Sequence, residues 1–347
     1  MIATLEGHRD GVKRVAFSPD GGRLLTQGPD ELLLWDLATK KSVKVVPRPP
    51  FLPARFSHDG KLIFMEHLGD NAEIFDVATG ATRRVKSDPQ VSGCFNSDGA
   101  SQVRFRPDGA SMHRPTKPFD TDSADKGHPL DVPAPMKVMG DFEGFSPFTL
   151  KGDLLAVKGK DRNVQLWQVA TGKRIGTLPK SQGSWYTFSP DGKLLAAECG
   201  EYVQRIASPS GVKDEAIKVF DTATGRERAT LELHPDDPPI RYVVFSPDSR
   251  LIASASNYTV KVWTAATGKL LAVMDKPKLA MHPQVVFRKG GRQLAGLTGG
   301  AVHVWNTGTG KLVHAIPQAT GVPDFSPDGQ SLAVGQERGP VRLYRLP

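Results

Sequence analysis

The chain has 347 residues, of which 39% are hydrophobic and 24% are charged, a balance typical of a soluble protein with a buried core. No run of about 18 apolar residues occurs, and the N-terminus lacks the basic and apolar segments of a secretory signal, so we expect neither a membrane span nor export. The two cysteines, Cys94 and Cys199, form no disulfide framework and suit a reducing, cytoplasmic compartment.

The chain is basic, with a formal net charge of +8. This excess permits attraction to nucleic acid or to an anionic surface. The longest basic runs are pairs such as Lys40-Lys41 and Arg83-Arg84, a pattern that favours a solvated, mildly basic surface over a dedicated nucleic-acid site. Nucleic-acid binding through this surface therefore stays a further alternative.

A short phrase recurs along the chain and predicts a strand followed by a tight turn. Its first copy is Phe17-Ser18-Pro19-Asp20-Gly21. In this reading Phe ends a half-buried strand, Pro fixes φ, Asp bonds to its own backbone and Gly takes a positive φ. Seven further copies, of which the one at Phe145 is damaged, begin at Phe56, Phe105, Phe145, Phe188, Phe245, Phe287 and Phe325.

Each copy is followed by further strand signals in a fixed order. Apolar residues, as at 24–25, 62–63 and 194–196, predict a second strand. A turn such as Ala223-Thr224-Gly225-Arg226 then precedes a fourth strand. The third strand of each unit lies between these two and ends in an aromatic residue, as at Trp35, Phe75, Trp167, Phe220, Trp263, Trp305 and Tyr344.

Four strands per unit, the Phe-Ser-Pro-Asp-Gly turn and the strand end at Trp35-Asp36 resemble the WD40 family over essentially the whole chain. The resemblance implies an all-β fold, in which four-stranded antiparallel blades surround the central channel of a single β-propeller. Such units have about 40–45 residues; dividing the chain by eight gives about 43 and by seven about 50. We therefore expect eight blades, with seven as the alternative.

The third unit is the weak point of this count. After Phe105 it offers Met112 as the apolar residue of its second strand, and its third strand has to be placed near Phe119. If this unit is not a blade, the ring has seven blades and a large insertion.

The two ends of the chain predict how the ring closes. Residues 3–8 match residues 229–234, which run from the fourth strand of the fifth unit into the sixth. The last unit ends with a third strand at 341–346 and has no fourth strand of its own. We therefore expect the N-terminal strand to complete the last blade, leaving no edge unpaired at the join and making residues 1–347 one domain.

The resemblance also implies residues that lock a blade internally. In WD40 repeats a His just before the first strand bonds to a Ser or Thr, an Asp and the Trp of its blade. The first expected set is His8, Thr26, Asp30 and Trp35. The second is His234, Ser254, Asn257 and Trp263, with Asn in place of Asp.

No catalytic or metal-binding motif is present. The chain lacks HExxH, paired-cysteine and Gly-x-Ser-x-Gly spacings, and the acidic stretch 120–127 lacks the Gly and Glu of a calcium loop. We therefore expect no enzyme activity, no cofactor and no metal. A ligand-binding or hydrolytic propeller with a channel-centred site is the alternative, but the residues three before each Phe, placed at the channel lip, include no Asp, Glu or His.

The resemblance implies that partners bind the face formed by the loops before the first strand and between the second and third strands. Residues 201–215 are predicted to be a loop insertion on this face. Candidate partner-binding residues are aromatic or arginine side chains, the types enriched in binding hot spots: Arg14, Trp185, Tyr202, Arg205, Tyr242 and Tyr258. The sequence thus predicts a monomeric, non-catalytic scaffold for protein or peptide partners.

Overall fold

The structure is a computed structural model. It describes residues 1–46, 54–57, 59–66, 71–86, 92–95, 102–106, 109–113, 128–130, 148–151, 153–158, 163–168, 171–179, 181, 186–202, 212–233, 240–275, 284–337 and 339–346. Within these ranges the regular elements are β-strands. The described part of the chain contains no helix with the length and hydrophobicity that a membrane crossing requires.

The strands within the described residues form eight four-stranded antiparallel sheets. Three of them precede residue 131: β2 (Arg14–Phe17), β3 (Arg23–Gln27), β4 (Leu32–Asp36) and β5 (Lys41–Val46); β6 (Arg55–Phe56), β7 (Leu62–Glu66), β8 (Asn71–Asp76) and β9 (Thr82–Lys86); and β10 (Ser92–Phe95), β11 (Gln102–Arg106), β12 (Gly109–His113) and β13 (His128–Leu130).

The next four sheets also use consecutive strands. They are β14 (Phe148–Lys151), β15 (Leu154–Lys158), β16 (Val164–Gln168) and β17 (Lys173–Leu178); β18 (Tyr186–Phe188), β19 (Leu194–Tyr202), β20 (Val212–Asp221) and β21 (Glu227–Leu231); β22 (Tyr242–Phe245), β23 (Leu251–Ala255), β24 (Val260–Thr264) and β25 (Leu270–Val273); and β26 (Val285–Phe287), β27 (Gln293–Thr298), β28 (Ala301–Asn306) and β29 (Leu312–Pro317).

The last sheet joins the two ends of the chain. Its order is β1 (Ala3–Leu5), β32 (Val341–Arg345), β31 (Ser331–Gly335) and β30 (Asp324–Phe325). Strand β1 runs antiparallel to β32, with Ala3 opposite Leu343 and Leu5 opposite Val341. The predicted closure of the last sheet by the N-terminal strand is confirmed.

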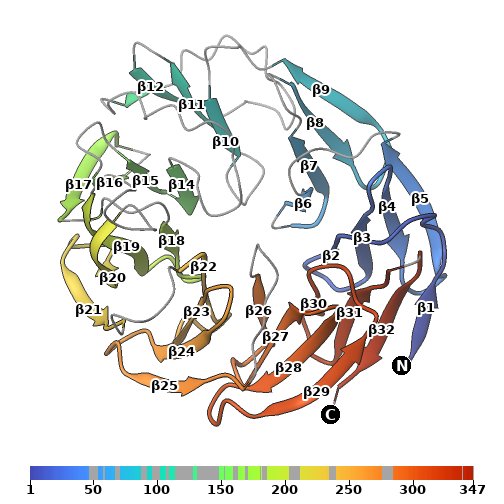
Figure 1. The fold of residues 1–347 in the computed structure, drawn as a ribbon. Helices are drawn as coiled ribbons and strands as arrows, with labels where there is room; N and C mark the ends of the chain where they lie inside the picture. The colour runs from blue at the N-terminus through green and yellow to red at the C-terminus, as the bar shows by residue number, and fades with distance from the viewer. Residues whose placement is uncertain are drawn as a thin grey trace.

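The sheets are arranged in a ring, with the first strand of each sheet toward the middle and the fourth at the rim (Figure 1). Neighbouring sheets touch through their inner strands, as in the contacts of β18 with β22 and of β22 with β26. At the join, β2 contacts both β30 and β31. The predicted all-β propeller architecture is confirmed.

The hydrophobic core lies between adjacent sheets. One cluster combines Val219 and Leu231 of the β18–β21 sheet with Val243, Phe245 and Trp263 of the next sheet. This packing follows from the alternation along each strand, which gives every sheet an apolar residue on both faces, as in the buried run of β4. Each sheet is therefore held mainly by its two neighbours, as in other repeat folds.

The recurrent phrase forms the predicted turn between first and second strands. In the first copy the Ser18 hydroxyl donates to the Asp20 carboxylate at 2.5 Å, Gly21 N–H donates to the Ser18 carbonyl at 2.8 Å, and Gly21 has a φ of 73°. The same Ser–Asp bond recurs in four further copies. These bonds lower the pKa of Asp20, chiefly through the Ser18 hydroxyl, so the turn carries an ionised carboxylate.

The third unit forms a sheet, but our assignment of its strands is wrong. Phe105 does not end a first strand; it lies within β11, the second strand, opposite Ser92 of β10. Met112 belongs to the third strand, β12, and Phe119 lies outside the described residues. The residue that ends the first strand is Phe95, which follows Phe56 at the same sequence distance as Phe56 follows Phe17.

The fourth unit also begins later than predicted. Its first strand is β14, which starts at Phe148 and pairs with β15 up to Lys151 opposite Leu154. The damaged phrase at Phe145 therefore precedes the first strand instead of ending it, and residues 145–147 themselves lie outside the described residues. The second strand predicted at 154–157 is confirmed as β15.

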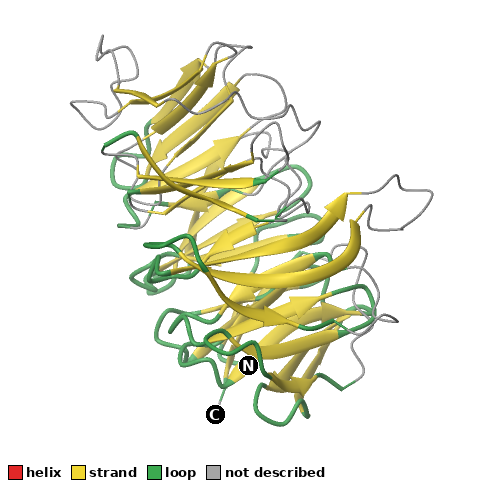
Figure 2. Cartoon of the chain, turned by 90° about the vertical axis from the view of Figure 1, so that its left-hand side faces the viewer, coloured by secondary structure: helices red, strands yellow, loops and turns green. Residues whose placement is uncertain are grey.

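The predicted loop insertion at 201–215 is largely an extension of two strands. Strand β19 continues to Tyr202 and β20 begins at Val212, with Glu201 opposite Lys213 and Tyr202 opposite Val212. A register shift between Cys199 and Glu201 separates this extension from the rest of the sheet. Figure 2, seen from the side of these strands, shows two long strands that extend past the surrounding loops.

Candidate interaction face

The connections before the first strand and between the second and third strands lie on one side of the ring, which we call the loop face. Residues 6–13 and 28–31 form its part beside the join, and the turn 256–259 between β23 and β24 forms another part. The opposite side carries the uniform Ser–Asp turns. Among the described residues, the variation from sheet to sheet is therefore concentrated on the loop face.

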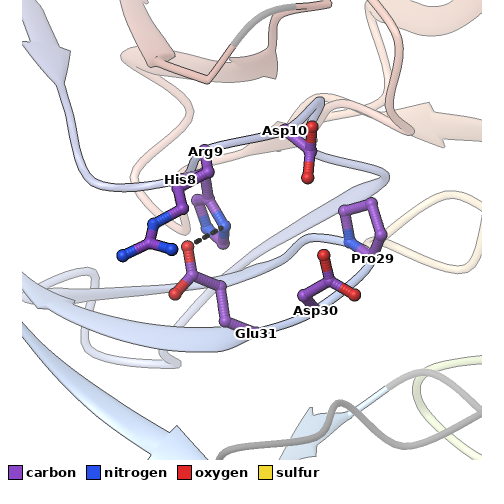
Figure 3. A pocket seen from close by; sticks show the side chains of 6 residues that line it. All are labelled: His8, Arg9, Asp10, Pro29, Asp30 and Glu31. Atoms are coloured by element: carbon purple, nitrogen blue, oxygen red, sulfur yellow. Dashed lines mark ion pairs between the residues drawn. The ribbon is translucent and has the colours of Figure 1, made fainter.

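A pocket of about 190 Å³ opens on the loop face beside the closing strand. Figure 3 shows its wall, in which Glu31 points at the ring of His8 while Asp10 and Asp30 project from the two facing loops. Arg9 and Pro29 complete the lining. The pocket is smaller than the roughly 300–1,000 Å³ of typical small-molecule sites, and its size suits one side chain of a partner better than a cofactor.

A buried hydrogen-bond chain anchors the pocket to the first sheet. His8 Nε2 lies 2.7 Å from the Thr26 hydroxyl, and Trp35 Nε1 donates to the same hydroxyl at 2.8 Å. His8 Nδ1 lies 3.5 Å from Glu31 Oε1. The Thr26 hydroxyl thus joins the indole of Trp35 to the imidazole of His8, whose other ring nitrogen faces Glu31.

The protonation of His8 follows from its surroundings. The side chain is buried, and burial lowers the pKa of His8, while the carboxylate of Glu31 acts in the opposite direction. Because its pKa lies below the usual value, the imidazole is neutral at pH 7. The structure brings together His8, Thr26 and Trp35 as expected, but the acid at the ring is Glu31, and Asp30 is exposed.

The second expected set is described in part. Trp263 Nε1 donates to the Ser254 hydroxyl at 2.9 Å, in the same geometry as Trp35 and Thr26. The side-chain oxygen of Asn257 is buried and has no hydrogen-bond partner among the described residues. His234 lies outside the described residues.

The channel lip holds two of the predicted partner-binding residues. Arg14 starts β2, bridges Val322 of the last sheet and donates from Nη1 to Gln284 Oε1 at 3.4 Å. Tyr242 is half-buried and packs on the apolar cluster between its own sheet and the next one. Arg14 therefore spans two sheet boundaries, while Tyr242 also serves the core.

The remaining predicted binding residues lie elsewhere on the same face. Tyr258, in the β23–β24 turn, is 64% exposed. Tyr202 belongs to the extended end of β19, where the structure gives its backbone position alone. Trp185 and Arg205 lie outside the described residues.

An acid that sequence reasoning missed lies at the join. Asp324 of β30 accepts a hydrogen bond from Phe17 N–H of β2 at 2.8 Å through Oδ2. Burial raises the pKa of Asp324 to about 7, against the hydrogen bonds from the backbone of Phe17 and Phe325. The signal in the sequence was weak: the residue before the Phe is apolar in some units, as at Val244 and Val286, but it is Arg55 in the second unit and Thr187 in the fifth.

The described residues hold no cluster of three or more His, Cys, Asp or Glu side chains arranged to bind a metal. Cys199 is buried as a free thiol, and burial raises its pKa to about 12. It is therefore protonated and unreactive at neutral pH.

A known family matches two segments of the chain that contain these repeats. The sequence profile of the family "WD domain, G-beta repeat" matches residues 1–36 and 225–264. The first match contains the His8, Thr26 and Trp35 chain, and the second ends at the Trp263 strand. This chain therefore contains WD40 repeats.

Several proteins are similar to parts of this WD40-repeat protein. It is 34% identical over 126 residues to eukaryotic translation initiation factor 3 subunit I of Scheffersomyces stipitis, a match that covers 35% of this chain and 31% of that one. It is 23% identical over 274 residues to apoptotic protease-activating factor 1 of Rattus norvegicus, covering 72% of this chain and 19% of the relative. The matched regions thus span less than a third of either relative.

Solved structures support the fold of the WD40-repeat protein over its whole length. The crystal structure of the computationally designed Ika8 protein aligns with a TM-score of 0.66, covering 99% of this chain and 98% of that one. At 18% sequence identity the likeness concerns the fold alone.

Proposed function

We propose that this WD40-repeat protein is a non-catalytic scaffold of the cytoplasm, a single domain over residues 1–347 that binds protein or peptide partners on its loop face as a monomer. The observation that carries the proposal is the difference between the two sides of the ring. The opposite side repeats one Ser–Asp turn from sheet to sheet. Within the described residues, the loops of the loop face differ from one another and display exposed side chains such as Tyr258.

The physical basis is a rigid ring that presents variable loops. Binding residues concentrate on such loops, because the scaffold fixes their position at little cost in packing. On the loop face, the pocket at His8 and Glu31 offers carboxylates of Asp10 and Asp30 to a basic partner side chain. Tyr258, in the β23–β24 turn of another sheet, offers a large aromatic contact on the same side of the ring. These features suit a polar peptide, with one side chain that packs on the ring of Tyr258, better than a small metabolite.

Two further observations support a scaffold in a reducing compartment. The relatives with WD repeats include a translation initiation factor subunit and an apoptotic protease-activating factor, whose names denote protein assemblies and regulators. Cys199 is a buried, protonated thiol that needs no partner cysteine. We therefore place the protein in the cytoplasm.

The proposal is tested by quantitative affinity capture from nuclease-treated lysate of the source cell. The variant Arg9→Ala/Tyr258→Ala removes two exposed side chains of the loop face without touching the core. Its matched control, Lys61→Ala, changes an exposed residue of the opposite side. We expect a stoichiometric protein partner to be lost from the loop-face variant and retained by the control.

Other outcomes contradict the proposal in different ways. A partner lost from Lys61→Ala and kept by the loop-face variant moves the site to the opposite side of the ring. Capture of nucleic acid alone, with an affinity that falls steeply as salt rises, replaces the scaffold by an electrostatic nucleic-acid binder. Both outcomes are read only for variants whose near-ultraviolet circular dichroism matches the wild type.

A further inference from the structure

The outer strands β25 and β29 differ from the outer strands of the other sheets. The two residues that begin each of them are apolar and exposed: Leu270 and Leu271 at 40% each, and Leu312 and Val313 at 41% each. The matching positions of other sheets hold Arg174 with Ile175 in β17, Glu227 with Arg228 in β21, and Thr82 with Arg83 in β9. An apolar stripe therefore occupies one sector of the rim.

The two apolar strands are held next to each other. Gly310, in the turn before β29, packs directly on the Val273 carbonyl at the end of β25, and Asp275 N–H donates to the Gly310 carbonyl at 2.9 Å. Figure 1 shows β25 and β29 following each other along the rim. We call the exposed apolar side chains of these two neighbouring outer strands the rim patch: Leu270, Leu271, Val273, Leu312 and Val313.

Strand β25 lacks the devices that protect an edge strand. It is the last strand in the hydrogen-bonded order of its sheet, and it reads Leu-Leu-Ala-Val without a charge or a proline. Charged residues stand in β5, β9, β17 and β21, and β1 is only three residues long. Proteins normally protect edges with charges, prolines or short strands, because an unprotected edge pairs with another strand.

The charges around the rim patch define the partner it fits. Lys269 and Lys311 immediately precede the two apolar strands, and Lys261 lies opposite Val273 on β24. Residues 260–275 and 301–317 contain a single acid, Asp275. The Asp that begins the preceding turn in other sheets, such as Asp36 or Asp221, is replaced here by Thr264 and Asn306. The rim patch is therefore apolar with a basic border.

We propose that the outer edge of β25 binds an extended segment of a partner protein, which adds a fifth strand to this sheet. Main-chain hydrogen bonds to β25 supply the pairing, apolar side chains of the segment cover Leu270, Leu271 and Val273, and acidic side chains lie near Lys269 and Lys311. This docking surface lies on the rim and is separate from the loop face.

A second copy of this chain is the less favourable occupant. Pairing two β25 edges places two basic borders, each with Lys269 and Lys311, along one interface between chains that each have a net charge of +8. Like charges across an interface oppose association, whereas an acidic segment gains from both the apolar and the charged contacts. Charge complementarity therefore selects the acidic partner.

The test uses the full chain and a fluorescent eight-residue peptide in which valine and glutamate alternate, capped at both ends. We expect saturable binding, measured by fluorescence anisotropy, that Leu271→Lys weakens by about tenfold or more. The matched control is Val43→Lys, an equally peripheral change at a residue of β5 that is 59% exposed. Val43→Lys should bind the peptide as the wild type does.

Two control peptides test the mode of binding on the wild-type protein, so the result does not depend on whether a variant folds. A peptide with lysine in place of glutamate should bind at least about tenfold more weakly. A peptide N-methylated at alternate residues, which cannot complete the main-chain pairing, should lose binding.

The proposal is overturned if Leu271→Lys and the wild type bind the glutamate peptide equally, or if the lysine or N-methylated peptide binds as well as the original. It is also overturned if sedimentation shows that the wild type is a dimer which Leu271→Lys dissociates, since the occupant is then a second copy. These outcomes leave the loop-face proposal untouched, because Leu271 and the loop face are separate.

Discussion

Single residues at the join determine how the stability of the ring depends on pH. The His8, Thr26 and Trp35 chain was predictable from the family resemblance, since these three residue types recur at fixed places in its repeats. The acid that faces His8 was not: Asp30 and Glu31 are neighbours in the sequence, and the turn between β3 and β4 determines which of them points inward. A turn of that kind is set by tertiary packing, which residue spacing alone does not encode.

The half-buried Asp324 predicts an unusual pH dependence. Its pKa is raised from 3.8 to about 7, so the folded state favours the protonated form. The stability that Asp324 contributes is fully present below about pH 4 and is lost as the pH rises through 7. Asp324→Asn, which can still accept from Phe17 N–H, should gain stability relative to the wild type between pH 4 and 8, by roughly 1–4 kcal/mol.

Urea unfolding at a series of pH values measures this difference. Asp59→Asn is the control, because the Ser57 hydroxyl and other contacts lower the pKa of the largely exposed Asp59. Its difference from the wild type should stay constant between pH 5 and 8. A difference for Asp324→Asn that is equally constant over this range would show that the carboxyl is ionised throughout.

At the scale of the strand and turn, glycines fix how adjacent sheets approach each other. The turn between third and fourth strands packs on the outer strand of the preceding sheet, as Gly268 does on Thr230 and Gly310 on Val273. A side chain at either glycine would collide with a backbone carbonyl. The spacing between neighbouring outer strands, including the two that carry the rim patch, therefore depends on the absence of a Cβ.

A pair of glycine substitutions separates this packing from backbone strain. Gly310 and Gly80 both have a φ of 72°, so alanine at either position should cost about 1–2 kcal/mol for the left-handed conformation. At Gly310 an added Cβ would lie 2.1 Å from the Val273 carbonyl oxygen, while at Gly80 nothing lies within 4 Å. We expect Gly310→Ala to destabilise the protein by roughly 1–3 kcal/mol more than Gly80→Ala in urea unfolding. Equal losses would mean that the turn can move away from β25.

The strands of some units could be predicted from the sequence, and those of others could not. Strands in the first, second and last four units followed from the Phe phrase and the aromatic strand ends, as at Phe245 and Trp263, whereas the fourth unit has only a damaged phrase. In the third unit the phrase at Phe105 has the right letters but lies inside a second strand. The copy at Phe95 has Asn and Ser in place of Ser and Pro, and only strand pairing distinguishes the two.

At the scale of the whole molecule, the closing sheet determines whether the ring holds. Strand β1 pairs with β32, and β2 is joined to the last sheet by the Arg14–Val322 bridge and by Val322 N–H donating to the Lys13 carbonyl at 3.1 Å. Leu5 fills the space between these sheets, at 1% exposure. Closure therefore uses an outer strand and an inner bridge together.

Removing the Leu5 side chain from the closing strand should destabilise the protein. Leu5→Ala removes a fully buried side chain and is expected to cost about 2–5 kcal/mol in free energy of unfolding. Ile2→Ala, in the same segment but 52% exposed, should change stability by no more than about 0.5 kcal/mol. Thermal and urea unfolding of both variants measure the contrast. If the two variants are equally stable, β1 contributes little to closure.

The pairing of β1 with β32 also determines when the last sheet can form during synthesis. Among the described strands β1 is synthesised first, and β32, which pairs with it, is synthesised last. Until then Leu5 has no buried place, and the incomplete ring shows an apolar edge to other nascent chains. Slow synthesis of the strands that complete the last sheet would therefore lengthen the time for which Leu5 stays exposed.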